Sequence, residues 1–323
     1  MSEPLVSVRD LKVHFQLPKP SMFGRHPMLH AVDGISFDVH KQRTVGIVGE
    51  SGCGKSTTGL AVLKLLDQVK GSVQFDGVDV LGLEPEALRQ LRRRMQIIFQ
   101  DPYSSLNPRQ TAEGIIRDPL NIQKIGSPTE RFEQVRDMFE LVGLQPSQLA
   151  LFPHQFSGGQ RQRISIAQAL ILNPDFVVCD EPVSALDLAI QAQILNLLCR
   201  LQEKLGLTYL FISHDLSVVH HICDEVIVMY LGKIVEKTDR SSLFKNPLHP
   251  YTRALLSAVP SRNPKTKSML NRVPLQGDLP SPVDPEDGCR FCSRCPIAEA
   301  RCAKEEPLLR EYAPNHWAAC HNV

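Results

Sequence analysis

Short apolar runs recur along the chain and are separated by longer amphipathic stretches. Apolar and polar residues alternate over 6–15 and 31–40, and a β-branched run at 44–48 ends directly in glycines. These patterns predict two antiparallel strands joined by a long loop, followed by a buried strand that turns into a loop. Three further apolar runs are separated by helical stretches and lie at 175–180, 207–213 and 225–231. The alternation predicts an α/β fold with a mostly parallel sheet.

Helical periodicity begins at Ser56 and returns over 84–94. Within the second stretch, the basic run Arg92–Arg94 is expected to form a solvated helix face. The middle of the chain is rich in helix formers and carries turn signals at 126–128 and at Gly143. It predicts a helical subdomain over about 101–172, inserted into the α/β core.

The composition changes near the C-terminus. Six prolines and few long apolar runs occupy 260–288, which predicts a semi-rigid, extended linker. With 323 residues and roughly 150 residues per domain, about two domains are expected. We therefore expect one large domain over 1–258 and a small cysteine-rich extension over 259–323.

Charge and hydropathy exclude some functions. The chain has 36 Lys and Arg against 35 Asp and Glu, so it lacks the basic footprint of a nucleic-acid-binding protein. Its apolar runs are much shorter than the roughly 20 residues that span a bilayer. The N-terminus has neither the basic nor the apolar region of a secretory signal, so we expect a cytosolic protein.

A glycine-rich motif follows the strand predicted at 44–48. Residues 49–56 fit G-x-x-x-x-G-K-[ST] between a strand and a helix, the context in which this motif cradles phosphates. Backbone N–H groups and the helix N-terminus would bind phosphate oxygens, Lys55 would reach the β- and γ-phosphates, and Ser56 would ligate Mg²⁺. The predicted ATP-binding residues are Gly49, Glu50, Ser51, Gly52, Cys53, Gly54, Lys55, Ser56 and Thr57.

Two adjacent carboxylates end the apolar run at 175–180. Asp180 is placed to join the Mg²⁺ shell, and Glu181 is placed to orient or deprotonate a water molecule. Together with the phosphate-binding motif, they predict a nucleoside triphosphatase.

Residues 156–163, FSGGQRQR, resemble the signature sequence of ATP-binding-cassette (ABC) ATPases. Four further elements resemble family motifs in the same order: Gln100 the Q-loop, 184–187 with Asp187 the D-loop, His214 the switch histidine, and Phe15 the aromatic that stacks on adenine. Phe23, in the segment between the first two strands, competes with Phe15 for that role. The resemblance covers residues 5 to about 245. It implies an ABC-type P-loop NTPase with a RecA-like core, an antiparallel β subdomain and an inserted helical subdomain.

The family mechanism implied by this resemblance has two cassettes that enclose two ATP molecules. Each γ-phosphate would meet the phosphate loop of one subunit and Ser157, Gly158, Gly159 and Gln160 of the other. Glu181 would be the general base and His214 would contact the γ-phosphate. Gln100 would contact Mg²⁺ and relay the nucleotide state to a membrane partner.

Five of the nine cysteines lie in the last 35 residues. In a reducing compartment such a group indicates metal ligation rather than disulfides. From spacing alone, Cys289, Cys292 and Cys295 match the C-x₂-C-x₂-C run of iron–sulfur proteins, with Cys302 or Cys320 completing the set.

The tail is also similar to the C-terminal extension of peptide-importer ABC ATPases, with the pattern Gly-Cys-x-Phe-x-x-Arg-Cys-Pro. Residues 101–108 and 246–252 resemble the same subfamily, most closely the dipeptide-permease F type. In that family, the resemblance implies a [4Fe–4S] cluster on Cys289, Cys295, Cys302 and Cys320, and Cys292 departs from the pattern. A structural Zn²⁺ site is the alternative.

The resemblance implies the ATP-hydrolysing subunit of a bacterial peptide importer, peripheral on the cytoplasmic face of the inner membrane. Its implied partners are a second, related ATPase in a heterodimer, two transmembrane permease subunits and, indirectly, a periplasmic solute-binding protein. One alternative keeps the machinery and changes the cargo to nickel or glutathione. Another is a soluble cassette ATPase acting on nucleic acid or ribosomes, and a third makes the cysteine tail a redox sensor.

Overall fold

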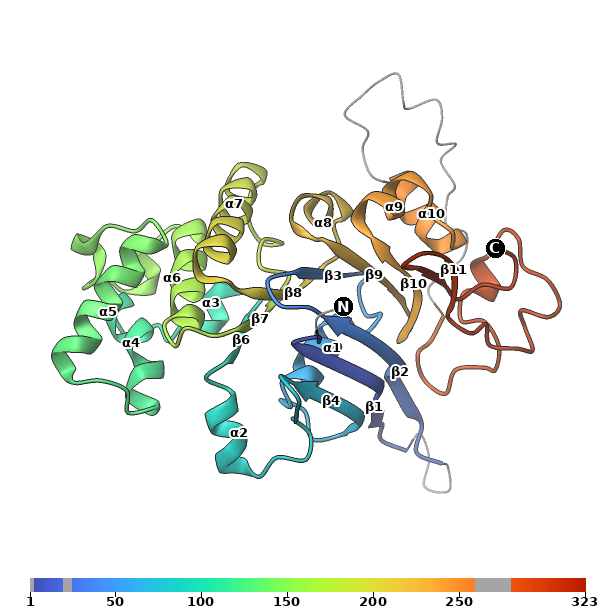
Figure 1. Ribbon diagram of the computed structural model, residues 1–323, viewed down its shortest axis with the longest axis horizontal. Helices are drawn as coiled ribbons and strands as arrows, with labels where there is room; N and C mark the ends of the chain where they lie inside the picture. Colours follow the sequence, from blue (N-terminus) through green and yellow to red (C-terminus); the bar gives the residue numbers. More distant parts are fainter. Residues whose placement is uncertain (1–2, 20–24, 259–279) are drawn as a thin grey trace, which may run out of the picture. The chain divides into compact units, whose positions relative to one another are not determined.

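A computed structural model describes residues 3–19, 25–258 and 280–323 (Figure 1). The chain divides into two compact units. The first unit comprises 1–40, 44–82 and 213–323, and the second comprises 41–43 and 83–212. Among the described residues, no helix is both long and apolar enough to cross a membrane.

The first unit contains an antiparallel sheet with strand order β2-β1-β4-β5. Its strands are β1 (Val6–Gln16), β2 (Met28–Val39), β4 (Val69–Phe75) and β5 (Val78–Asp79). On β1, Val6 and Val8, and then Leu11 and Val13, are completely buried, because every second side chain of a strand faces the core. The pairing register with β2 shifts between Val8 and Leu11, so the alternation moves by one residue there. The predicted antiparallel pair is therefore confirmed. Residues 20–24, including Phe23, lie outside the described residues.

A second group of strands in this unit has the order β11-β12-β10-β9-β3. The strands are β3 (Thr44–Val48), β9 (Glu225–Tyr230), β10 (Lys233–Asp239), β11 (Arg310–Ala313) and β12 (His316–Ala318). The β3 strand runs parallel to β9 and is buried at every position, as its apolar sequence predicts. The unit's helices are α1 (Lys55–Val62), α8 (Leu216–Ile222), α9 (Arg240–Lys245) and α10 (Pro250–Ala258).

The described part of the extension packs onto the first unit. Strand β12 pairs antiparallel with β10, so the C-terminal residues lengthen the sheet, drawn in red beside the orange β10 in Figure 1. At the other end, the His30 N–H donates to the Pro282 carbonyl at 3.0 Å and the Asp284 N–H donates to the Met28 carbonyl at 2.9 Å. The last part of the predicted linker is therefore held along the edge strand β2. Its residues 259–279 lie outside the described residues.

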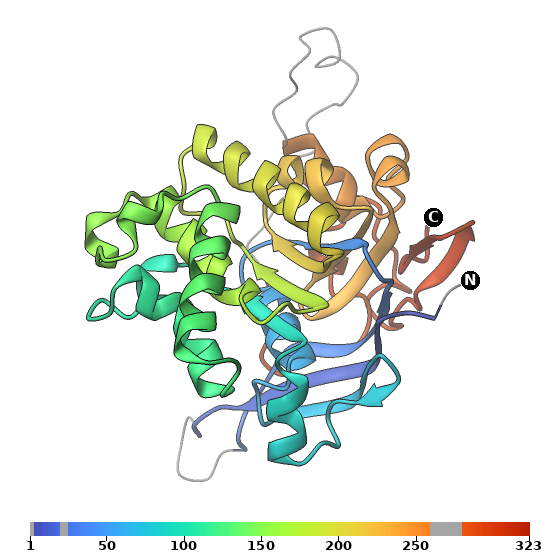
Figure 2. The same cartoon turned by 60° about the vertical axis from the view of Figure 1, so that its left-hand side comes forward.

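The second unit contains the parallel strands β6 (Met95–Ile98), β7 (Phe176–Asp180) and β8 (Thr208–Ser213). Helices α4, α5 and α6 pack against one another in its helical part (Figure 2). These helices lie within the stretch for which the sequence predicts a helical subdomain. The helices are α2 (Pro85–Leu91), α3 (Pro102–Ser105), α4 (Ala112–Ile122), α5 (Pro128–Leu141), α6 (Gly158–Leu170) and α7 (Leu188–Leu205).

The expectation for Arg92–Arg94 was wrong. Helix α2 ends at Leu91, and the three arginines form the turn that leads into β6. All three are partly buried, and Arg94 Nε lies 2.5 Å from the Asp175 carboxylate. The run therefore leads into β6, where Arg94 pairs with Asp175, and does not line a solvated helix face.

Candidate functional site

Residues 49–54 form a tight loop between β3 and α1. Gly54 has a φ of 102°, a left-handed conformation that L side chains rarely adopt. A Cβ at Gly54 would lie 2.0 Å from the Ala31 carbonyl oxygen. The sequence requires glycine here because the loop passes directly against β2. Within the loop, Ser51 and Gly52 are exposed and Cys53 is buried.

The Lys55 side chain turns into this loop. Its Nζ donates to the carbonyls of Gly49 and Glu50, each at 2.9 Å, and only 5% of the residue is exposed. Ser56 and Thr57 follow in the first turn of α1, and the N-terminus of a helix favours a bound anion. This arrangement of lysine, backbone and helix terminus suits the phosphates of a nucleotide.

The two predicted acidic residues lie at the end of β7 in the second unit. Asp180 is the last strand residue and is 8% exposed. Glu181 has a φ of 46°, which is uncommon for a residue other than glycine and typical of strained functional positions. Its N–H donates to the Ile212 carbonyl at 3.0 Å, so β8 holds this conformation. Gln100 Nε2 donates to Glu181 Oε2 at 3.0 Å.

The signature residues form the start of α6. The Ser157 hydroxyl accepts from the Gln160 N–H at 3.3 Å, and the Gln160 side chain accepts from the Ser157 N–H at 3.0 Å, which is a capping box. A Cβ at Gly159 would lie 2.5 Å from Ile190, so glycine permits close packing of α6 on α7. Asp187 caps α7 by accepting from the Ile190 N–H at 3.0 Å. These residues therefore stabilise α6 and α7 in addition to their predicted contacts with ATP.

The remaining predicted site residues lie in the first unit. His214 is exposed directly after β8, ahead of α8. Phe15 lies near the end of β1, opposite Leu29 of β2, and is half-buried. The structure thus brings Gln100 onto Glu181 in one unit and gathers the phosphate loop around Lys55 in the other.

All five C-terminal cysteines line one small cavity, together with His249 and Phe291. Burial raises the pKa of the Cys289 thiol to about 11, and the neighbouring thiols Cys302, Cys295 and Cys320 add to this effect. Burial also raises the pKa of Cys295 and of Cys320. A bound cation would reverse this preference, because it stabilises thiolates.

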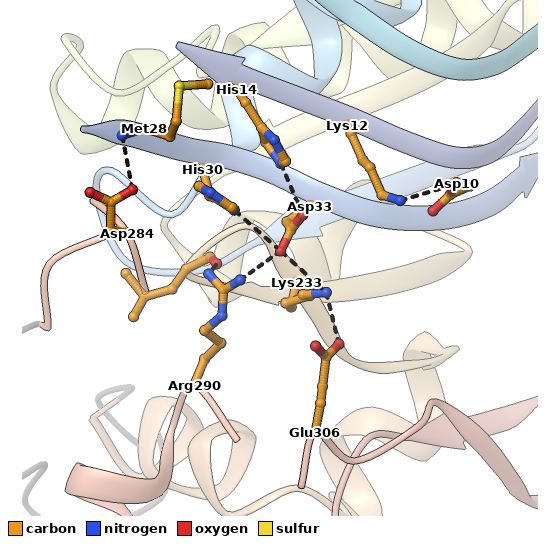
Figure 3. A network of polar contacts seen from close by, with 11 residues as sticks. Asp10, Lys12, His14, Met28, His30, Asp33, Lys233, Asp284, Arg290 and Glu306 are labelled. Atoms are coloured by element: carbon orange, nitrogen blue, oxygen red, sulfur yellow. Dashed lines mark hydrogen bonds and ion pairs between the residues drawn. The ribbon is translucent and has the colours of Figure 1, made fainter. Parts of the chain in front are cut away.

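One other group could in principle hold a metal ion, formed by His14, His30 and Asp33 (Figure 3). However, the Asp33 carboxylate already binds Arg290 at 2.6 Å and Lys233 at 3.3 Å. Burial would raise the pKa of Asp33, but Lys233, His14 and Arg290 outweigh it and hold the pKa at about 2. Two cations beside the carboxylate disfavour a metal ion, so we assign this group as an ion-pair network that joins β2, β10 and the extension.

Sequence reasoning did not assign a role to an aromatic cluster beside the phosphate loop. It consists of Tyr230, His249, Tyr251 and Phe291, with ring centroids 4.7–5.6 Å apart. The Tyr251 hydroxyl accepts from the Glu50 N–H at 2.8 Å. The sequence signal that could have indicated this cluster is the Phe of the Gly-Cys-x-Phe-x-x-Arg pattern. This residue, Phe291, is almost completely buried.

Comparison with known proteins gives two family matches. Residues 32–184 match the ABC transporter family, and residues 235–302 match the C-terminal region of oligopeptide/dipeptide transporters. Three relatives are a putative peptide import ATP-binding protein of Brucella ovis, an oligopeptide transport ATP-binding protein of Bacillus subtilis (AppF) and the dipeptide transport ATP-binding protein DppF of Escherichia coli. They are 52%, 49% and 47% identical over 98%, 99% and 100% of this chain, and 97%, 97% and 96% of theirs.

Solved structures with a similar fold include a dimeric, post-hydrolysis state of the ATP-binding cassette MJ0796 with ADP and Pi bound. The match has a TM-score of 0.65 at 26% identity and covers 73% of this chain and 98% of that one. The structure of cbiO1 from Clostridium perfringens, part of the ABC transporter complex cbiONQ, has a TM-score of 0.64 at 24% identity, and the match covers 76% of this chain and 92% of that one.

Proposed function

This chain belongs to the ABC transporter family, among its peptide-import ATP-binding proteins, and we propose on that premise that it binds ATP at residues 49–57 and hydrolyses it to drive peptide import. The observation that carries the proposal is the phosphate loop. Its lysine is buried, bonded to two loop carbonyls, and placed at the start of α1. Likeness to peptide importers over the whole chain favours peptide cargo over nickel or glutathione.

The residues of the first unit would bind the nucleotide. Lys55 exchanges its two carbonyl partners for the β- and γ-phosphate oxygens, which carry more negative charge. The α1 N-terminus adds N–H donors, and Phe15 stacks on the adenine. His214, exposed after β8, contacts the γ-phosphate.

The residues of the second unit would activate water. Glu181 accepts the proton of the attacking water, and Gln100 holds its carboxylate until nucleotide binds. The hard oxygen donors of Ser56, Asp180 and Gln100 fit Mg²⁺. When bound, Mg²⁺ neutralises phosphate charge in the transition state.

Glu181→Gln tests the catalytic assignment. The amide keeps the shape and the hydrogen bond to Gln100 but cannot take a proton, so ATP should bind with unchanged affinity while hydrolysis falls by 10²-fold or more. The exposed Glu203→Gln, on α7, is the matched control and should hydrolyse at the native rate. Hydrolysis by Glu181→Gln at the native rate would contradict the assignment.

We infer that two cassettes close around ATP, with the α6 N-terminus at 157–160 donating to the γ-phosphate bound by the partner. The exposure of Ser157 and Gly158 supports this, as do structural neighbours that are dimeric cassettes. We expect a related but distinct ATPase as the partner. Glu181→Gln with ATP should form a stable heterodimer with it on size-exclusion chromatography. If only a homodimer of this chain formed, the inference of a heterodimer would be wrong.

The membrane assembly is also inferred. Two permease subunits, fed by a periplasmic solute-binding protein, would form the peptide path, and this chain would dock on their cytoplasmic side at the inner membrane. Co-purification from detergent-solubilised membranes tests this. Recovery of the chain only in the fraction that remains after membranes are removed would contradict it.

For the cysteine cavity, we infer a [4Fe–4S] cluster on Cys289, Cys295, Cys302 and Cys320. The four thiols line one cavity, which offers a cluster the four thiolate ligands that it requires. Iron and sulfide analysis of anaerobically purified protein, with visible absorbance, tests the inference. Colourless protein with stoichiometric zinc would refute it. Cys292→Ser should retain the iron that Cys295→Ser loses.

A further inference from the structure

A side chain of the cysteine-rich extension binds directly to the phosphate loop. The Arg294 guanidinium makes two parallel contacts with the Glu50 carboxylate, from NH1 to Oε2 at 2.8 Å and from NH2 to Oε1 at 3.1 Å. The side chains are only 7% and 26% exposed, respectively. Paired contacts of this kind between arginine and carboxylate are strong and geometrically specific. Their partial burial limits screening by salt.

Glu50 is held through each of its polar groups. Its N–H donates to the Tyr251 hydroxyl at 2.8 Å, and its carbonyl accepts from Lys55 Nζ at 2.9 Å. Its carboxylate binds Arg294. Two of these three partners come from α10 and the extension, outside the loop itself. The conformation of the loop therefore depends on residues about 200 and 244 positions away in the sequence.

Neighbouring residues hold Arg294 in place. It lies between Cys292 and Cys295 and also donates to the Tyr230 hydroxyl at 3.3 Å. Three residues earlier, Phe291 is buried in the aromatic cluster and contacts Tyr230 edge-on, with ring centroids 5.2 Å apart. The guanidinium is therefore presented to the loop by a packed segment instead of a free tail.

The charge of Glu50 explains why the contact matters. A carboxylate in a loop that receives a triphosphate repels its ligand, and the repulsion is strong in a partly buried site. Arg294 neutralises this carboxylate and holds both of its oxygens. Without Arg294, the Glu50 carboxylate is free to compete with the phosphates for the Lys55 ammonium.

We propose that Arg294 is a positioning residue for ATP: it holds and neutralises Glu50, so that the extension sets the nucleotide affinity of the phosphate loop. This rests on the proposed function of the loop. The residue acts through Glu50 and does not touch the nucleotide. The proposal gives the segment between the cysteines a role that does not depend on the metal they hold.

Equilibrium binding of ATP with Mg²⁺ to the purified full chain tests the proposal. Arg294→Gln should weaken ATP binding about tenfold, an effect that the repulsion of one unneutralised carboxylate can produce. The double variant Arg294→Gln/Glu50→Gln should recover binding to within about threefold, because no carboxylate is left unpaired. Arg294→Lys should fall between the wild type and Arg294→Gln.

Two controls separate this role from a structural one. Arg301→Gln removes an exposed arginine of the same extension, which pairs with Glu305, and should bind ATP like the wild type. The emission of the only tryptophan, Trp317 on β12, reports whether the extension stays attached.

The outcomes distinguish the two proposals. Failure of the wild-type chain to bind ATP contradicts the proposed function itself. Normal ATP binding by Arg294→Gln, with the wild type binding ATP, overturns the positioning role alone. The positioning role is also overturned if the double variant binds ATP as weakly as Arg294→Gln. Removing the Glu50 charge would then not restore the ATP affinity, so the loss of affinity would come from lost structure.

Discussion

Replacing Asp33 by asparagine should loosen the attachment of the C-terminal extension. Asp33 on β2 binds Arg290 of the extension at 2.6 Å, His14 at 2.9 Å and Lys233 of β10 at 3.3 Å (Figure 3). Asparagine keeps the volume but removes the charge. In this variant Lys233 keeps its ion pair with Glu306 at 2.7 Å. The residue that mainly loses its charged partner is therefore Arg290, whose side chain is only 9% exposed.

The magnitude follows from the pKa of Asp33, which the network lowers from 3.8 to about 2. That difference corresponds to at most about 2–3 kcal/mol, and solvent screening at the 14%-exposed carboxylate reduces it to about 1–2 kcal/mol. Asp38→Asn is the matched control on the same strand. Its partner Arg9 is half exposed, so this pair should contribute under about 1 kcal/mol.

Urea unfolding followed by Trp317 emission measures the effect, because the only tryptophan lies on β12 of the extension. The depressed pKa means that the ionised carboxylate stabilises the fold above about pH 4 and that this contribution is lost as the pH falls toward 2. The difference between wild type and Asp33→Asn should thus be present at pH 5 to 7 and shrink below pH 4. Equal unfolding midpoints for Asp33→Asn and Asp38→Asn at pH 7 would refute the reasoning.

Two further predictions concern the loop and the buried contact between β10 and the extension. Gly54→Ala should abolish ATP binding, measured by equilibrium titration, because its Cβ would lie 2.0 Å from the Ala31 carbonyl oxygen; Gly77→Ala, whose Cβ meets nothing within 4 Å, should bind normally. Glu236→Gln should cost about 2–4 kcal/mol by Trp317-detected unfolding, since this completely buried carboxylate accepts from His316 at 2.8 Å and from the Leu248 and His249 N–H groups. An unfolding curve of Glu236→Gln that overlays the wild type would show that these contacts do not hold the extension.

The local features of the fold could be predicted from the sequence, because their signals lie within a few residues. The run at 44–48, the glycines before Lys55 and the helix beginning beside Ser56 define strand, loop and helix together. The prediction for Arg92–Arg94 was wrong because it used only local charge. Local charge does not reveal that Arg94 pairs with Asp175, which is distant in the sequence.

Contacts between distant segments could not be predicted. Asp33 and Arg290 are 257 residues apart, and Glu50 and Arg294 are 244 residues apart. An ion pair leaves no periodicity in either segment, so a single sequence cannot show which carboxylate an arginine binds. The pairing of β12 with β10 is equally invisible, since three strand residues carry too weak a pattern. These contacts join the extension to β2, to the phosphate loop and to β10, respectively.

The central claim is that ATP hydrolysis by this chain drives peptide import. Its most direct test is uptake of labelled di- and oligopeptides by the reconstituted complex in vesicles, with wild type or Glu181→Gln as the ATPase subunit. The account predicts ATP-dependent peptide uptake with the wild type and none with Glu181→Gln, although the variant binds ATP. Uptake of nickel or glutathione without peptide, or equal peptide uptake with both proteins, would contradict it.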